Sequence, residues 1–118
     1  MTQEDKELLL LKDLCARLPY GVKCYDEVQR EVGVFKHFEY DGFGRIHNGR
    51  GVRFIENIKP YLFPMSSMTD EQKDFYWNHG IDFGDAWTEV DWLNKNHFDY
   101  RGLIEKGLAL DATGLGIY

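Results

Sequence analysis

A short run near the end of the chain, His97, Asp99 and Tyr100, is the sharpest local cluster of groups that could do chemistry. A histidine base that a carboxylate orients can activate a nucleophile. The same residues also suit a helix end, where His97 meets the helix dipole and Asp99 and Arg101 hold a turn. Because one pentapeptide does not assemble a site, we favour the turn and predict no catalytic residues and no enzyme activity.

A glycine-rich stretch offers a second chemistry. Gly44, Gly49, Arg50 and Gly51 stand close to the spacing of a phosphate-binding loop. Arg50 replaces the lysine of that loop, and Gly51 replaces the Ser or Thr that would hold magnesium. The pattern therefore fails on chemistry, and hairpin turns explain the glycines through their backbone freedom.

The histidines and cysteines give no metal-binding pattern. The four histidines form no HxH or HxxxH pair, and Cys15 and Cys24 form no CxxC motif. We expect no metal, no cofactor and no disulfide, with each cysteine a reduced, buried, small apolar side chain.

The excess negative charge lies in one segment. The net charge is −6, and residues 70–91 hold seven acidic residues against one lysine, together with five aromatic residues. Aromatic rings supply contact area and carboxylates steer a basic partner, so we predict a partner-binding surface here. Its residues would be Asp70, Glu71, Asp74, Trp77, Asp85 and Trp87. A pair of ordinary amphipathic helices, with aromatic residues in the core and acids in water, remains the alternative.

A second candidate surface is basic. Arg45, Arg50 and Arg53, with His37, lie close together in the sequence and could accept the phosphates of a nucleotide or another small anionic ligand. Direct nucleic-acid binding is disfavoured, because acids almost balance the basic residues of 20–59.

The first element that must support these residues is a helix over 3–17. Thr2 and Asp5 form a capping-box pattern, and Pro19 and Gly21 stop the helix. One apolar face recurs at three- and four-residue spacing and predicts the buried side: Leu8, Leu11, Cys15 and Leu18.

An antiparallel β-meander follows. Residues 22–25 and 32–40 are rich in β-formers, and Asp41-Gly42 and Asn48-Gly49 are hairpin signals. If both loops are two-residue turns, Phe38 opposes Arg45 and Phe43 opposes Phe54, which makes that aromatic face the core. A one-residue error in either turn would reverse the faces.

The rest of the chain reads as a connection and two helices. Residues 58–69 hold two prolines and predict an ordered connection that caps the core. A second capping box, Thr69 and Gln72, opens a short helix that ends near Gly80, and a third helix runs to about Asn96. We predict a single α+β domain over 1–118, with an N-terminal helix, a small antiparallel β-meander (a partly open barrel or sheet) and two short C-terminal helices.

Size and composition fit that prediction. The chain has 118 residues, of which 43% are hydrophobic, enough for one core without a metal or disulfide. The N-terminus opens with acids, and its longest apolar run is Leu8 to Leu11, so we expect neither an export signal nor a membrane span. We therefore expect a cytoplasmic protein.

Three stretches of the chain carry a resemblance to known proteins: LPYGVKC (18–24), IKPYLFPMSSMT (58–69) and WLNKNHFDYRGLIEKGLAL (92–110). They resemble a family of short uncharacterised proteins encoded by phages and mobile elements of anaerobic gut bacteria. The resemblance implies an accessory role, a small β-meander flanked by helices and a bacterial cytoplasm, and it implies no known activity. We thus expect a non-enzymatic protein that engages a host or phage protein of unknown identity through the acidic aromatic segment. The partner would be a host defence or nucleic-acid-handling complex that the protein inhibits, and the alternative is a small-molecule or nucleotide binder that uses the meander arginines.

Overall fold

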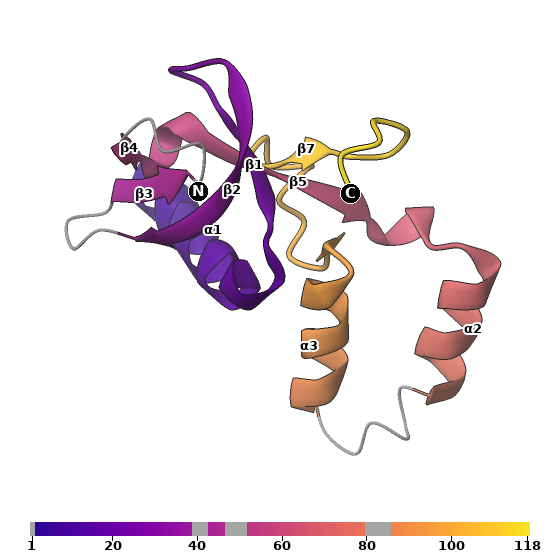
Figure 1. Ribbon diagram of the computed structural model, residues 1–118. Coiled ribbons are helices and arrows are strands. Elements are labelled where there is room, and N and C mark those ends of the chain that lie inside the picture. The colour runs from indigo at the N-terminus through magenta and orange to yellow at the C-terminus, as the bar shows by residue number, and fades with distance from the viewer. Residues whose placement is uncertain (1, 39–42, 47–51, 80–85) are drawn as a thin grey trace.

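The computed structural model describes residues 2–38, 43–46, 52–79 and 86–118, with side chains for all of these except 37–38, 43–46, 52, 78–79 and 86–88. In chain order the elements are α1 (Gln3–Arg17), β1 (Lys23–Asp26), β2 (Glu31–Phe38), β3 (Phe43–Ile46), β4 (Val52–Phe54), β5 (Ile58–Pro64), α2 (Asp70–His79), α3 (Ala86–Lys95), β6 (Phe98–Asp99) and β7 (Leu110–Asp111). Helices and a sheet occupy separate stretches, so the predicted α+β class and N-terminal helix are confirmed (Figure 1).

Helix α1 has the predicted ends but a different buried face. The Thr2 hydroxyl accepts the N–H of Asp5 at 3.1 Å, and the Asp5 carboxylate accepts the N–H of Thr2 at 3.2 Å. The buried side chains are Leu10, Asp13, Leu14 and Arg17. The predicted face is wrong at two positions, because Leu8 is 55% exposed and Cys15 is exposed. Leu11 and Leu18 do pack against the core, and Cys24 is buried as expected. Four consecutive leucines offer more than one apolar face, and the Asp13–Arg17 ion pair lies in the interior.

The meander is present, and the register of its first hairpin differs from the prediction. Strands β2, β3 and β4 pair antiparallel in sequence order, and Phe43 opposes Phe54 as expected. Phe38, however, opposes Gly44 rather than Arg45, and the register shifts once more between residues 35 and 37. The expected core face is also wrong at β4, where Phe54 is 53% exposed.

Strand β5 lies in the segment predicted as a connection, and it pairs with three other strands. The strands pair in the order β4-β3-β2-β1-β5, and β5 pairs in addition with β6 and with β7. Both β6 and β7 run parallel to β5, so the sheet is mixed and not purely antiparallel. These two strands follow α3, so the helices are not the last elements of the chain as predicted.

The hydrogen-bonding pattern between β1 and β5 explains why the sheet tolerates a proline at position 60. Pro60 is buried opposite Cys24 of β1. The N–H of Glu27 donates to the carbonyl of Asn57, and hydrogen-bonded pairs alternate along an antiparallel ladder. Position 60 therefore falls at a non-hydrogen-bonded pair, where the missing N–H of proline costs the β1 ladder nothing.

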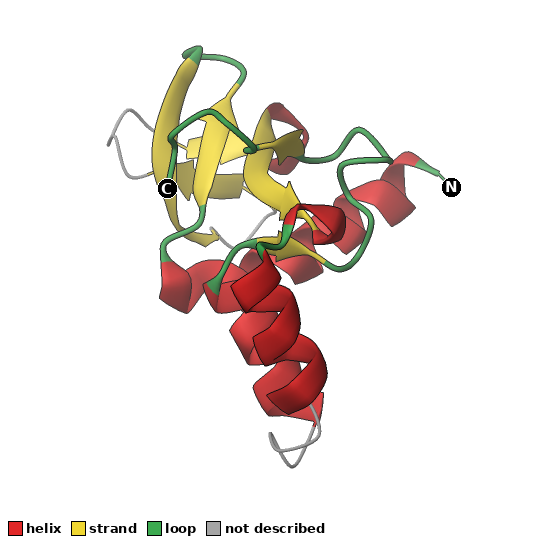
Figure 2. Cartoon of the chain, turned by 90° about the vertical axis from the view of Figure 1, so that its right-hand side faces the viewer, coloured by secondary structure: helices red, strands yellow, loops and turns green. Residues whose placement is uncertain are grey.

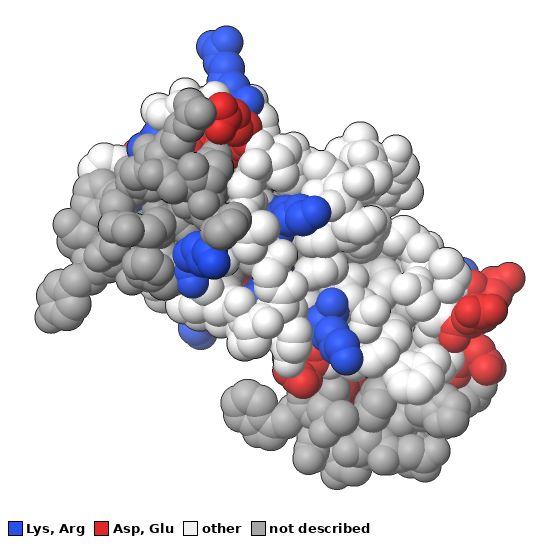
Figure 3. Space-filling model, viewed as in Figure 1, with Lys and Arg blue, Asp and Glu red and all other residues white. Residues whose placement is uncertain are grey.

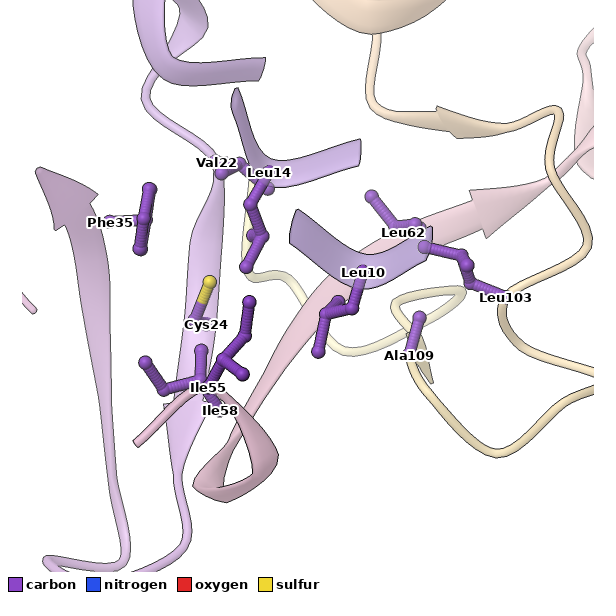
Figure 4. Packing of buried hydrophobic residues seen from close by; sticks show 10 residues of the cluster. All are labelled: Leu10, Leu14, Val22, Cys24, Phe35, Ile55, Ile58, Leu62, Leu103 and Ala109. Carbon is purple, nitrogen blue, oxygen red and sulfur yellow. The ribbon is translucent and has the colours of Figure 1, made fainter. Parts of the chain in front are cut away.

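The main core lies between α1 and the sheet. Ten buried residues form it: Leu10, Leu14, Val22, Cys24, Phe35, Ile55, Ile58, Leu62, Leu103 and Ala109 (Figure 4). A second cluster holds Met68, Leu93 and Phe98, with aromatic rings of α2 and α3 packed against it. The α2 and α3 helices extend away from the sheet and α1 in both views (Figures 1 and 2). No helix within the described residues is long and apolar enough to cross a membrane.

Candidate functional site

Helix α2 carries most of the predicted partner-binding residues, and its start is defined by side chains. The Thr69 hydroxyl accepts the backbone N–H of Gln72 at 3.1 Å, and the side-chain oxygen of Gln72 (Oε1) accepts the backbone N–H of Thr69 at 2.9 Å. This is the predicted capping box. Asp70 and Glu71 fill the first turn, where the helix dipole favours negative charge.

The inner side of α2 is held by ring contacts on α3. Trp92 stacks with Phe75 at a centroid distance of 5.4 Å, with Tyr76 at 5.8 Å and with Phe98 of β6 at 5.8 Å. The Tyr76 hydroxyl donates to Glu89 at 2.6 Å. This hydrogen bond, with burial and the charge of the carboxylate, raises the pKa of Tyr76 to about 12. Trp92 thus joins α2 and α3 to the body of the protein.

The outer side of α2 combines acids with an exposed ring. Asp70, Lys73, Asp74 and Trp77 stand at positions i, i+3, i+4 and i+7 of the helix and therefore share one face. Trp77 is 72% exposed, and its ring makes an edge contact with the ring of Tyr76. Acidic side chains gather along this side of the molecule (Figure 3). We call these four residues the α2 outer face.

The other predicted partner residues lie apart from this face or outside the described residues. Glu71 is exposed on α2 beside the outer face. Asp85 falls outside the described residues, and Trp87 lies in the first turn of α3, with its side chain outside the description. Two further acids of the segment are engaged by tyrosines, Glu89 by Tyr76 and Asp91 by Tyr20. The structure therefore brings together Asp70, Asp74 and Trp77, with Glu71 next to them.

The arginines proposed as a phosphate site do not form one surface among the described residues. Arg45 pairs with Val52 of β4 and with His37 of β2, whereas Arg53 pairs with Gly44. Because Val52 and Arg53 are successive residues of β4, the positions of Arg45 and Arg53 fall on opposite faces of the β-meander. Arg53 also binds the buried carboxylate of Asp26, with Nε 3.2 Å from Oδ2. Arg50 lies outside the described residues.

The cluster after α3 forms a turn and not an oriented catalytic base. The Asp99 carboxylate accepts the N–H of Leu103 at 2.9 Å and of Ile104 at 3.0 Å. The Tyr100 hydroxyl donates to Asn94 at 2.8 Å. Both groups are directed to the local backbone and to α3, so neither orients His97, in agreement with the turn interpretation.

A buried ion pair, which sequence reasoning missed, ties α1 to this turn. The Arg17 guanidinium binds Asp13 through Nε at 2.8 Å and Nη2 at 3.1 Å, and neither side chain is exposed. Arg17 Nη2 also donates to the carbonyl of Phe98 at 2.6 Å, and Arg101 binds Asp13 at 2.9 Å. The (i, i+4) spacing of Asp13 and Arg17 was the available signal, but surface helices show the same spacing.

Tyr118 is the other residue that sequence reasoning missed. The next hydrogen-bonded pair of the β1–β5 ladder would join Lys23 to Tyr61. Instead, the Tyr118 hydroxyl accepts the N–H of Lys23 at 2.8 Å and donates to the carbonyl of Tyr61 at 2.8 Å. Further along β5, the N–H of Phe63 donates to the carbonyl of His97. The Tyr118 hydroxyl thus bridges the gap between β1 and β6 on one edge of β5.

His97 lies against Tyr118 in an unusual conformation. Its φ is 63°, in the left-handed region, and its ring stacks on the Tyr118 ring at a centroid distance of 3.7 Å and 12°. Its Nδ1 is buried without a hydrogen-bond partner. Burial, followed by the charges of Arg17 and Lys23, lowers the pKa of His97 to about 4, so the ring is neutral at pH 7.

Two further results bear on the site. The described part of the chain holds no group of three or more His, Cys, Asp or Glu that could bind a metal ion. In comparisons with known proteins, no family model, no curated protein and no solved structure matches the chain.

Proposed function

We propose that this chain is a binding protein that engages a partner protein through the α2 outer face. The observation that carries the proposal is Trp77, which is 72% exposed on a helix that extends from the body of the protein. A large ring in solvent contributes nothing to the core. On a protein surface, such a ring is the kind of residue that anchors an interface.

The acids beside Trp77 support an interface rather than a solvated helix. Asp70 lies two turns and Asp74 one turn before Trp77 on the same face, and Glu71 adds a third exposed carboxylate nearby. Charges around a central ring speed association with an oppositely charged surface and exclude partners of like charge. The expected partner surface is therefore an apolar pocket ringed by lysine and arginine side chains.

Such a partner surface is typical of proteins that handle nucleic acid, because they cluster basic residues to contact phosphates. We propose a host nucleic-acid-handling protein as the partner and inhibition of that protein by occupation of its basic surface as the effect. The resemblance to phage and mobile-element proteins supports a host partner.

The test compares capture by variants of the full chain. Wild type, Trp77→Ala and the triple variant Asp70→Asn, Glu71→Gln, Asp74→Asn are immobilised and exposed to lysate of the cells that carry the gene. The bound protein is then identified, purified and titrated by calorimetry at two salt concentrations. We expect Trp77→Ala to weaken Kd at least about thirtyfold, which corresponds to about 2 kcal/mol for an anchor residue. The triple variant should lower the association rate and its dependence on salt.

Matched controls separate the face from general effects. Phe54→Ala removes another exposed ring, from β4, and Glu4→Gln, Glu56→Gln, Glu105→Gln removes three exposed acids elsewhere. Both control variants should bind the partner with wild-type affinity, and both should still inhibit its binding to nucleic acid. A partner that binds Trp77→Ala as tightly as wild type would contradict the proposal.

A further inference from the structure

A cavity of about 360 Å³ lies at the base of α2, away from the α2 outer face. It is open to solvent, and three parts of the chain line it: the end of β5 with the turn before α2, the end of α3 with β6, and the C-terminal residue. Its described lining residues are Phe63, Ser67, Thr69, Gln72, Lys95, Asn96, His97, Phe98 and Tyr118. This volume lies in the range of sites that hold small molecules.

Aromatic rings form one part of the cavity lining. Phe63 lies 5.8 Å from the Tyr118 ring and 6.3 Å from the Phe98 ring, at tilts of 53° and 57°. His97 stacks on Tyr118 and adds a further flat surface. Rings that are tilted toward one another leave faces and edges for a planar ligand.

The charged side chain at the cavity is basic. Lys95 carries it, and none of the described lining residues is Asp or Glu. Lys23 Nζ lies 5.7 Å from the centre of the Tyr118 ring, and the charge of Arg17 also acts on both His97 and Tyr118. Asp99, next to Phe98, is engaged by backbone N–H groups. An anionic ligand would therefore meet lysine rather than carboxylate.

One of the two described non-glycine residues with a positive φ lies at the cavity wall, the other being Arg30. His97 adopts a positive φ that non-glycine residues avoid, and its buried Nδ1 has no partner. Both features carry a free-energy cost, and such costs concentrate at ligand sites. The conformation places the His97 ring on Tyr118 at the cavity wall.

We propose that this cavity binds a small planar aromatic molecule with one carboxylate, its ring against Phe63 and Tyr118, next to the buried Phe98, and its carboxylate at Lys95. Ser67, Gln72 and Asn96 also line the cavity and are held by local hydrogen bonds. The Ser67 hydroxyl donates to the carbonyl of Pro64, Asn96 Nδ2 donates to the carbonyl of Trp92, and Gln72 Oε1 accepts the N–H of Thr69. This proposal is independent of the α2 outer face, because none of the four residues of that face lines the cavity.

The test uses indole-3-acetate as the probe and indole-3-acetamide as its neutral analogue of the same shape. Each is titrated into the full, isotopically labelled chain to about 1 mM, and the shifts of backbone and aromatic resonances are followed by NMR. We expect indole-3-acetate to shift the resonances of Phe63, Phe98 and Tyr118, with the acetamide at least about tenfold weaker. Bound carboxylate should also raise the pKa of His97, since a negative charge favours the imidazolium.

Two lysine variants sharpen the result. Lys95→Gln removes the cation of the cavity, whereas Lys73→Gln removes a lysine of α2 that does not line it. Lys95→Gln should weaken the acetate about tenfold and leave the acetamide unchanged, and Lys73→Gln should change neither. No shift at the three rings at about 1 mM, or equal binding of acetate and acetamide, would overturn the proposal. Retained affinity in Lys95→Gln would overturn it as well.

Discussion

His97 makes both destabilising and stabilising contributions to the free energy of folding. Its left-handed backbone and unpartnered Nδ1 cost free energy, while its stack on Tyr118 and its backbone hydrogen bond to Phe63 recover part of it. Asn, which tolerates the left-handed region, is therefore the natural substitution for separating the ring from the backbone conformation.

Protonation of His97 should destabilise the fold. Its pKa of about 4 in the folded protein lies below the ordinary 6.5, so folding favours the neutral ring. That contribution is complete above pH 6.5 and is lost as the pH falls toward 4. Because the ring is partly exposed, we expect a loss of about 1–2 kcal/mol. The measurement is urea unfolding of wild type and His97→Asn near pH 7 and near pH 4.5. Titration of the carboxylates lowers stability in both proteins, and wild type should lose a further amount that His97→Asn does not lose. Identical pH profiles of the two proteins would contradict the prediction.

Tyr118→Phe should open the β1–β5 ladder locally. The change removes the hydroxyl between Lys23 N–H and Tyr61 C=O and keeps the ring that stacks on His97. We expect a destabilisation of about 1–2 kcal/mol and faster exchange of the Lys23 amide hydrogen. The control is Tyr20→Phe, which removes a hydroxyl bonded to Asp91 at the surface and should cost less than about 0.5 kcal/mol. Equal effects of the two variants would show that the bridge adds no stability.

At the scale of elements, α1 and β5 show what the sequence could and could not predict. The capping box and Pro19 give the ends of α1, because those signals act within a few residues. The buried face of α1 depends on what packs against it, and four leucines in a row leave that choice to tertiary contacts. The sequence did not predict strand β5, because a proline such as Pro60 usually indicates a break in a strand. The sheet tolerates Pro60 only because of its position in the ladder with β1.

The Asp13–Arg17 pair anchors α1 to β6, and breaking it should cost more than removing it. Arg17→Met leaves a buried carboxylate with only Arg101 as its cation, and we expect a loss of about 3–5 kcal/mol. The double variant Asp13→Leu, Arg17→Met should be more stable than the sum of the two single losses predicts. The exposed Gln3–Glu7 pair of the same spacing is the control, and Glu7→Gln should cost less than about 0.5 kcal/mol. Additive losses in denaturant unfolding would contradict this account.

At the scale of the whole molecule, the two candidate sites differ in how far sequence could predict them. Asp70, Asp74 and Trp77 share a helix, so helical period alone places them on one face. His97 and Tyr118 meet only because β1 and β6 share an edge of β5, and no local pattern encodes that edge. The charge count identified the α2 segment, and the contacts of Glu89 and Asp91 then show that tyrosines engage two of its acids.

The two hydrophobic clusters should unfold with different cooperativity. The main core joins α1 to the sheet, whereas α2 is held through the stacks of Trp92 with Phe75 and Tyr76. Trp92→Ala should release α2, raising exchange of its amide hydrogens at least about tenfold while those of α1 stay protected. Leu14→Ala in the main core should instead cost about 2–5 kcal/mol and raise exchange throughout. Hydrogen exchange followed by mass spectrometry separates the two patterns, and uniform exchange in Trp92→Ala would mean that α2 unfolds only together with the core.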